Sequence, residues 1–424
     1  MRLRSAALAA FVAVCAVAFP THAADPLTLD DAFLRVADAH PDLRLFGARH
    51  EALKAELDRS SLRPALVAGA EVENGTGPAS GLDGAEITLS LASVLERGGK
   101  LDARRTLAQS RIDALAIERE AQRLDLLAEV ARRYLAVVGA QREGELAQLD
   151  VDQRERTVAA ARRRHEAGAS PESVVLTAQA ALARSELDRA RARQRQAAAR
   201  QHLAALWGER NPAFEILGGD LLAVPQIADF AVLADWLQRT PELAQFVDQQ
   251  RIGEARLQLA RSEATPDFDW QVGVRRMADA DDFGLVGSVS IPLGTTRRAQ
   301  PGIRAARAEL TALEIEREAV GLSLYSTLAE AHGRFGVARL EAQRLGEGVL
   351  PRLAKAEAAA ATAYRAGAAS YLEWSSLQAE RAAARQQQLA AALEAQRALI
   401  EIQRLTGQAF VAGPGPQDNQ GATP

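Results

Sequence analysis

Cysteine, methionine and histidine, the sulfur and imidazole ligands of metal sites, are sparse in this 424-residue chain. Its single cysteine is Cys15, and Met277 is the only methionine after the initiator, so no series of thioether ligands for Cu(I) exists. Beyond the N-terminal segment the histidines stand singly, whereas a metal site needs several ligands together. A lone helical histidine is usually a surface or packing residue. These histidines are His40, His50, His165, His202 and His332.

Sequence signatures of enzymes are also missing. Gly98-Gly-Lys100 lacks the Gly-x-x-x-x-Gly-Lys-Ser/Thr spacing of a phosphate-binding loop, and no Gly-x-Ser-x-Gly nucleophile elbow occurs. With 51 basic and 55 acidic residues the net charge is −4, and no concentrated basic face for nucleic acid is evident. We therefore expect no enzymatic activity, no cofactor and no nucleic-acid partner.

The chemistry that remains is charge carried by segments in which apolar and polar residues alternate. Such alternation runs through residues 65–73, 86–91, 267–275 and 285–291. A period of two predicts strands with one apolar and one polar face, here four strands in two hairpins. The polar face would carry Glu71, Glu73, Glu86, Asp267, Asp269, Gln271 and Arg275.

Five of these polar residues are acidic and one is basic. If the face lines a water-filled conduit, the excess of carboxylates would favour cations inside it. The alternative is that these side chains are only solvated, because charge in a lumen tunes selectivity without being needed for the fold.

Long Ala-rich helices must hold the strands. Apolar spacing predicts one helix over about residues 100–166, which would reach roughly 100 Å. Gly168-Ala-Ser-Pro171 ends it, because Gly suits the position after a helix and Pro the first turn of the next. A return helix then runs over about 172–206, and the second half does the same through Gly367. A soluble coiled-coil rod, the alternative, leaves the four strands unexplained.

The chain repeats this layout once. His40-Pro41 reappears as Thr240-Pro241, and Trp207-Gly208 as Thr406-Gly407, a spacing of about 200 residues that is far above solenoid periods. We expect a first repeat over residues 24–207 and a second over 231–410. A Gly-, Pro- and Asn-containing linker at 208–230 joins them, and a disordered tail follows at 411–424.

The N-terminal 23 residues read as a secretory signal peptide. Arg2 and Arg4 precede an apolar stretch from Ala6 to Phe19, and Thr21-His-Ala23 is a small-residue cleavage site. About 14 apolar residues are too few for a membrane span, and no later segment has 18 apolar residues without charge.

An exported chain with amphipathic strands about nine residues long fits a membrane β-barrel, with lipid outside and water inside. Four strands cannot close a barrel, and an open edge in lipid leaves backbone groups unpaired. Identical chains must then share one sheet, and three copies give about twelve strands. The charged helices would project from one end as a helical tube.

The whole mature chain resembles the TolC-like outer-membrane efflux protein family. The resemblance rests on Leu27-Thr-Leu-Asp-Asp-Ala32, on Ser90 with Glu96-Arg-Gly-Gly-Lys100, on Ser290-Ile-Pro-Leu293, and on the helical turns at Gly168 and Gly367. The Gly-Gly-Lys turn and the Pro-Leu pair are most similar to the heavy-metal (CzcC-type) branch. The fold this implies is mainly α with a β-barrel portion: a trimer with a shared 12-stranded barrel continued by a periplasmic helical barrel.

The resemblance also implies roles for the helical tips. In the family, acidic residues after the second Gly ring the periplasmic gate; here Glu373 matches the nearer position, whereas Ser376 occupies the farther one and Val174 the equivalent place in the first repeat. A solvated helix charge is the alternative for Glu373. The tips would dock a periplasmic adaptor through Arg164, Gly168, Ala169, Ser170, Arg365, Gly367, Ala368 and Ala369. Ordinary turn chemistry is a sufficient alternative for the glycines.

The implied function is that of an outer-membrane exit duct of a tripartite RND-type efflux system. Its partners would be two further copies of the chain, outer-membrane lipid, a periplasmic adaptor and an inner-membrane RND pump. Divalent heavy-metal cations are the expected substrates. Efflux of drugs or organic compounds, or type I secretion, is the alternative, and a structural periplasmic coiled-coil protein is a rival of another class.

Overall fold

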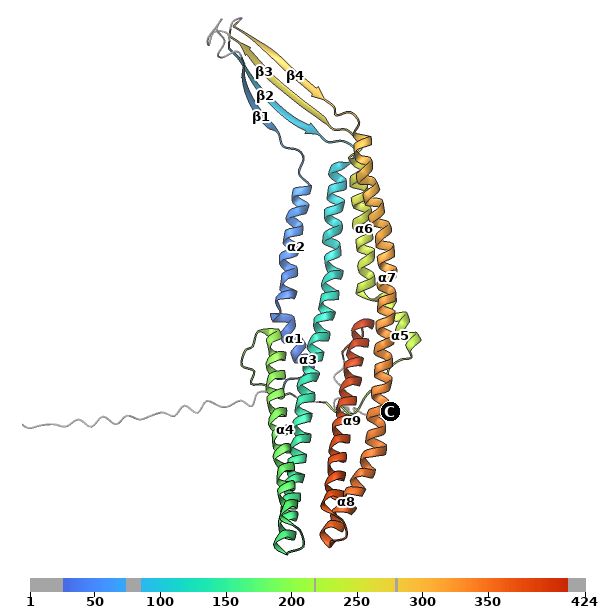
Figure 1. The fold of residues 1–424 in the computed structure, drawn as a ribbon. Helices are drawn as coiled ribbons and strands as arrows, with labels where there is room; N and C mark the ends of the chain where they lie inside the picture. The colour runs from blue at the N-terminus through green and yellow to red at the C-terminus, as the bar shows by residue number, and fades with distance from the viewer. Residues whose placement is uncertain (1–25, 74–84, 217–218, 279–280, 411–424) are drawn as a thin grey trace, which may run out of the picture.

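The computed structural model describes residues 26–73, 85–216, 219–278 and 281–410. Helices stand side by side along a long axis, a four-stranded sheet occupies one end, and two helical hairpin tips form the other (Figure 1). The predicted signal peptide, the segment 74–84 between the first two strands and the predicted tail 411–424 lie outside the described residues.

The first half follows the predicted order. Helices α1 (Leu29–Ala39) and α2 (Pro41–Ser60) lead to β1 (Val67–Glu73) and β2 (Glu86–Leu95), and the hairpin of α3 (Lys100–Glu166) and α4 (Glu172–Ala204) follows. The side chain of Thr28 accepts a hydrogen bond from the backbone of Asp31, whose carboxylate accepts one from the Thr28 backbone N–H, so a capping box opens α1. Helix α3 ends before Gly168, whose φ of 69° suits a residue without a side chain.

The second half repeats the order of the helices and strands, with one additional interruption in its long hairpin. After α5 (Phe230–Trp236) come α6 (Pro241–Ser262), β3 (Phe268–Met277), β4 (Asp282–Ser290) and α7 (Thr295–Arg344). A π-helical turn, Leu345–Val349, then precedes α8 (Leu350–Ala366), and α9 (Tyr371–Thr406) returns.

The π-helical turn was not predicted and has a local cause. Pro351 has no N–H to donate, and Gly346 and Gly348 weaken the helix around it. The regular hydrogen-bond ladder is therefore interrupted in the second hairpin, whereas α3 runs for 67 residues without a break.

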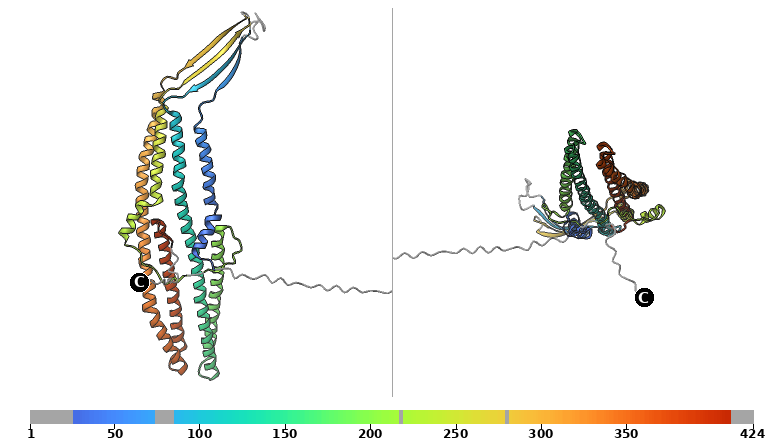
Figure 2. Two further views of the ribbon diagram at one scale, coloured as in Figure 1. Left: turned by 180° about the vertical axis from the view of Figure 1, so that it is seen from behind. Right: turned by 90° about the horizontal axis from the view of Figure 1, so that it is seen from below.

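The four strands form one antiparallel sheet in the order β1-β2-β3-β4, so each hairpin pairs within itself and β2 pairs with β3 across the repeat. Figures 1 and 2 show the sheet leaning away from the helical axis. Each strand connects directly to one long helix: β1 to α2, β2 to α3, β3 to α6 and β4 to α7. In the described residues no helix is long and apolar enough to cross a membrane.

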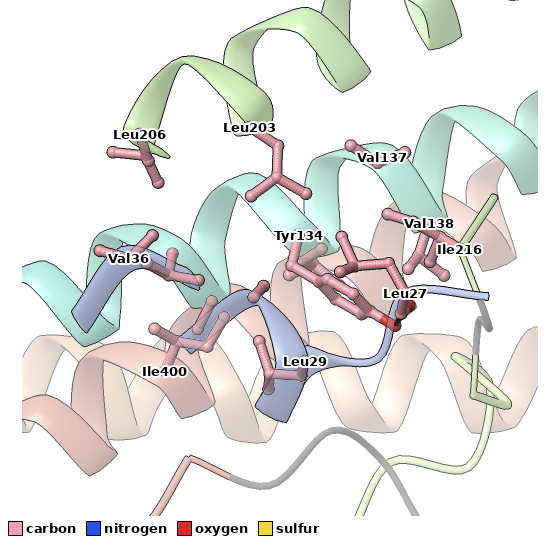
Figure 3. Packing of buried hydrophobic residues seen from close by; sticks show 14 of the residues in the cluster. Leu27, Leu29, Val36, Tyr134, Val137, Val138, Leu203, Leu206, Ile216 and Ile400 are labelled. Atoms are coloured by element: carbon pink, nitrogen blue, oxygen red, sulfur yellow. Dashed lines mark hydrogen bonds between the residues drawn. The ribbon is translucent and has the colours of Figure 1, made fainter. Parts of the chain in front are cut away.

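The main core lies at mid-height, where segments far apart in sequence meet. Leu27, from the N-terminal segment, forms a parallel bridge with Ile216, and the hydroxyl of Tyr134 donates a hydrogen bond to the Leu27 carbonyl at 3.1 Å. Burial raises the pKa of Tyr134 to about 12. Figure 3 shows these side chains packed with Leu203 of α4 and Ile400 of α9.

The predicted linker takes part in this core. Phe214, Ile216 and Leu221 are all buried in the same cluster as Tyr134. The described parts of this segment, 208–216 and 219–230, therefore pack against the helices through these side chains, and Phe230 is already in α5.

Candidate functional site

The strand register separates the two faces of the sheet. Glu71 lies opposite Thr88, Thr88 opposite Arg275, and Arg275 opposite Gly284, so these positions share one face. By the same register that face carries Glu71, Glu73, Glu86, Asp269, Gln271, Arg275, Asp282, Ser288 and Ser290. The other face carries Val72, Ile87, Leu89, Leu91, Trp270, Val272, Val274, Leu285 and Val289.

Arg275 offsets part of the negative charge on the polar face. Its guanidinium lies 2.9 Å from Glu86 and 3.3 Å from Glu73, and its Nε donates a hydrogen bond to the Thr88 hydroxyl at 3.0 Å. Glu71, Asp269 and Asp282 have no basic side chain within 4.0 Å among the described residues. The unpaired negative charge of the face is therefore carried by these three carboxylates.

Asp267 does not lie on the polar strand face as predicted. It precedes β3, where its carboxylate contacts Lys100 Nζ at 2.6 Å and accepts a hydrogen bond from the Arg97 backbone N–H at 2.9 Å. Burial alone would raise the pKa of Asp267, but the Lys100 ion pair and the Arg97 N–H outweigh it and hold the pKa below its usual value. Asp267 thus ties the start of α3 to the start of β3. Without Asp267 the strand face carries five acids, Glu71, Glu73, Glu86, Asp269 and Asp282, against Arg275, a net charge of −4.

The contact of Asp267 with Lys100 and Arg97 predicts that the stability of the fold depends on pH. Because the pKa of Asp267 is lower in the folded chain, its contribution is present above about pH 4 and is lost as the pH falls through the folded value. Asp267→Asn should lower stability by about 1–2 kcal/mol at neutral pH. Thermal unfolding from pH 7 down to pH 3 should show the difference from wild type shrinking only below about pH 4. Glu263→Gln, at an exposed neighbour, is the matched control, and an equal loss there would contradict the assignment.

At the tips, Arg164 joins the two hairpins. From α3 it donates to the Tyr364 carbonyl of α8, its guanidinium lies 4.7 Å from the centre of the Tyr364 ring, and it also donates to the Ala169 carbonyl at 3.3 Å. Tyr364 packs in turn on Trp374 of α9, with ring centres 5.1 Å apart. Arg164, predicted as a docking residue, is therefore engaged within the chain.

The other predicted tip residues lie at the exposed turns. Gly168 and Gly367 have φ of 69° and 81°, which explains both glycines through turn geometry. Arg365 is exposed and donates to the Ala361 carbonyl of its own helix. Ala169, Ser170, Ala368 and Ala369 form the remainder of the two turns.

Glu373 is exposed in the first turn of α9, and its N–H donates to the Ser370 hydroxyl at 3.2 Å. Ser370 caps the helix, and the Ser-x-x-Glu spacing is the signal that indicates this cap. A carboxylate here is also favoured by the helix dipole. Glu373 therefore has a local structural role at the start of α9, and its side chain is exposed.

Comparison with known proteins decides the family. Residues 35–209 match the family described as outer membrane efflux protein. The chain is 31% identical over 343 residues to Protein CyaE of Bordetella pertussis, covering 76% of this chain and 71% of that protein. The chain belongs to the outer membrane efflux protein family.

Two further comparisons, one of sequence and one of structure, agree with the assignment of this chain as an outer membrane efflux protein. It is 28% identical over 355 residues to the cobalt-zinc-cadmium resistance protein CzcC of Cupriavidus metallidurans, covering 84% of each chain. Its fold matches the crystal structure of CusC with a TM-score of 0.76 at 17% identity, over 90% of this chain and 92% of that one. The predicted TolC-like fold and the outer-membrane channel function are confirmed, and family members are channels and not enzymes.

One polar cluster of this efflux protein was missed from the sequence. Glu357 of α8 is buried, pairs with Arg381 of α9, and accepts a hydrogen bond from Gln153 of α3 at 2.8 Å. Beside it, buried Gln378 donates to the Thr157 hydroxyl at 2.9 Å. The cluster joins three helices from both repeats, and no local spacing could have indicated it. Within the described ranges, no three His, Cys, Asp or Glu side chains gather into a metal site.

Proposed function

We propose that this outer-membrane channel works as a homotrimer that conducts divalent heavy-metal cations out of the cell. The carrying observation is the similarity to the cobalt-zinc-cadmium resistance protein over 84% of both chains. The polar sheet face, with a net charge of −4 per chain, supports cations as the preferred cargo. Export of drugs or organic compounds is the alternative substrate class.

A shared barrel supports the trimer. Within one chain β1 and β4 each pair on one side only, and the apolar face is exposed at Val72, Leu89, Val272 and Leu285. In lipid, both edges need partners, and three copies supply about twelve strands in a closed sheet. The apolar face then meets lipid, and the face with Glu71 and Asp269 meets water.

The tips support docking of a periplasmic adaptor, which would connect the channel to an inner-membrane RND pump. Small residues at both turns, Gly168 with Ala169 and Gly367 with Ala368, let another helical tip approach closely. Arg365 and Ser170 lie beside them and offer polar contacts. Energy for transport would come from the pump.

Growth on metal tests the substrate. Deleting the gene for this chain should make the host bacterium more sensitive to zinc, cobalt and cadmium salts. Expression of the wild-type chain should restore resistance. Sensitivity to organic dyes and detergents serves as the comparison. Unchanged metal tolerance together with new dye sensitivity would favour the organic substrate class.

A second test concerns the entrance. We expect Glu373 from three subunits to form an acidic ring, so Glu373→Gln should lower the preference for cations over anions, most clearly at low salt. Single-channel reversal potentials under a salt gradient measure this preference. Glu172→Gln, in the first turn of α4, is the matched control. Equal selectivity of the Glu373 variant and wild type would leave the entrance as a steric gate only.

A further inference from the structure

The junction between the sheet and the helices is strongly basic, in contrast to the whole chain. The four connections between strands and helices, residues 61–66, 96–105, 261–267 and 291–298, hold eight basic and four acidic side chains, a net charge of +4. The whole chain has a net charge of −4. We call this set of connections the basic collar.

Two of the four acidic side chains in the collar form ion pairs within it, and most of the arginines have no acidic partner. Glu96 pairs with Arg104, and Asp267 with Lys100. Only Asp102 and Glu263 remain, both exposed, against six exposed arginines that have no carboxylate within 4.0 Å among the described residues. These six are Arg63, Arg97, Arg105, Arg261, Arg297 and Arg298, and every one of the four connections contributes.

Their positions are not explained by the fold. Arg297 and Arg298 occupy the first turn of α7, where the helix dipole disfavours cations. That turn carries no acidic residue to offset them. A negatively charged ligand bound near the start of α7 would offset the unfavourable interaction between these arginines and the helix dipole.

The collar lies directly below the apolar face of the sheet. Leu95 and Phe268 pair on that face at the helix end of β2 and β3, and the Arg97 guanidinium lies 4.6 Å from the centre of the Phe268 ring. Leu66 and Leu293, in two other connections, are also exposed. Arg97 is thereby placed on the lipid side, at the boundary between apolar surface and water.

We propose that the basic collar binds the phosphate headgroups of phospholipids in the periplasmic leaflet of the outer membrane. The proposal rests on the proposed membrane barrel, because the barrel brings this leaflet to the collar. Arginine suits phosphate through its planar, bidentate donors. Basic residues next to a membrane surface favour anionic lipid by about 1 kcal/mol each, or about fivefold per residue at low salt.

The test uses the full-length channel in vesicles of equal parts phosphatidylglycerol and phosphatidylcholine. Spin-labelled versions of each lipid report the fraction immobilised by the protein, and hence the preference for the anionic headgroup. The test variant is Arg63→Gln with Arg97→Gln and Arg298→Gln, one residue from each of three connections. The matched control replaces Arg184, Arg193 and Arg317, which are exposed on the long helices.

We expect wild type and the control to prefer phosphatidylglycerol, and the collar variant to lose at least about fivefold of that preference. Replacing the same three residues by Lys should keep most of it, and high salt should abolish it in all proteins. Equal preference in the collar variant and wild type, or the same loss in the Lys variant, would overturn the proposal.

Channel conductance in the same vesicles separates this proposal from the proposed function. Conducting collar variants that retain wild-type lipid preference would overturn the lipid site and leave the channel assignment intact. Wild-type protein that neither inserts nor conducts would overturn the barrel itself. Phosphate ions in solution provide a further comparison. If they remove the wild-type preference for phosphatidylglycerol as fully as the collar substitutions do, the collar is a site for free anions, and the proposal is also overturned.

Discussion

Replacing Val272 with Arg is expected to impair membrane insertion, at a cost of about 2–4 kcal/mol near the bilayer midplane. Val272 lies in the middle of β3 on the apolar face, opposite Leu91 and Gly287, and is more than half exposed in the single chain. The measurement is the amount of heat-modifiable oligomer in the outer-membrane fraction.

Gln271→Arg is the control, because the adjacent residue points to the polar face and should tolerate the charge. Cysteines at positions 270, 271 and 272, labelled with a water-soluble reagent, test the same alternation. Only position 271 should react freely. Equal insertion of both arginine variants, or equal labelling at all three positions, would contradict the assignment of the faces.

Glu357→Ala is expected to destabilise the lower helices by about 3–5 kcal/mol, because removal of one partner leaves the other charge of a buried ion pair uncompensated. Arg381 would lose its carboxylate, and Gln153 its hydrogen-bond acceptor on α8. Limited proteolysis and urea unfolding of the purified protein would measure the effect.

Glu347→Ala, at an exposed position one turn above α8, should change stability by no more than about 0.5 kcal/mol. Glu357→Gln separates charge from shape, since the amide keeps an oxygen for Gln153 but cannot neutralise Arg381. A Glu357→Ala protein as stable as the Glu347→Ala protein would show that the cluster does not hold the hairpins together.

Local sequence patterns were sufficient to predict the helices and strands and to assign the strand residues to the two faces of the sheet. Alternation in residues 267–275 depends only on the two-residue period of a strand, so Gln271 and Val272 could be assigned to opposite faces before the pairing was known. Gly168 could be placed after a helix because a positive φ is easily reached only by glycine.

Pairing across long sequence separations could not be predicted in this way. Asp267 contacts Lys100 and Arg97, which are more than 160 residues away, so its charge was wrongly counted on the strand face. Arg275 meets Glu73 and Glu86 only because β2 pairs with β3. For the same reason the sequence did not indicate the Gln153–Glu357 hydrogen bond or the contact of Arg164 with the Tyr364 carbonyl, because each joins residues of different repeats.

The two unpaired edges of the sheet bear on how the channel is made. A single chain that reaches the membrane exposes the free sides of β1 and β4 and an apolar face with nothing to cover it. In the proposed trimer, such a chain would tend to aggregate until two further copies cover its edges, so productive insertion should depend steeply on local concentration. In the proposed shared barrel, a subunit with one altered edge strand would also prevent the wild-type subunits of the same trimer from closing the sheet. Defects at β1 or β4 are then expected to be dominant over a wild-type copy, whereas defects in the helical tips need not be.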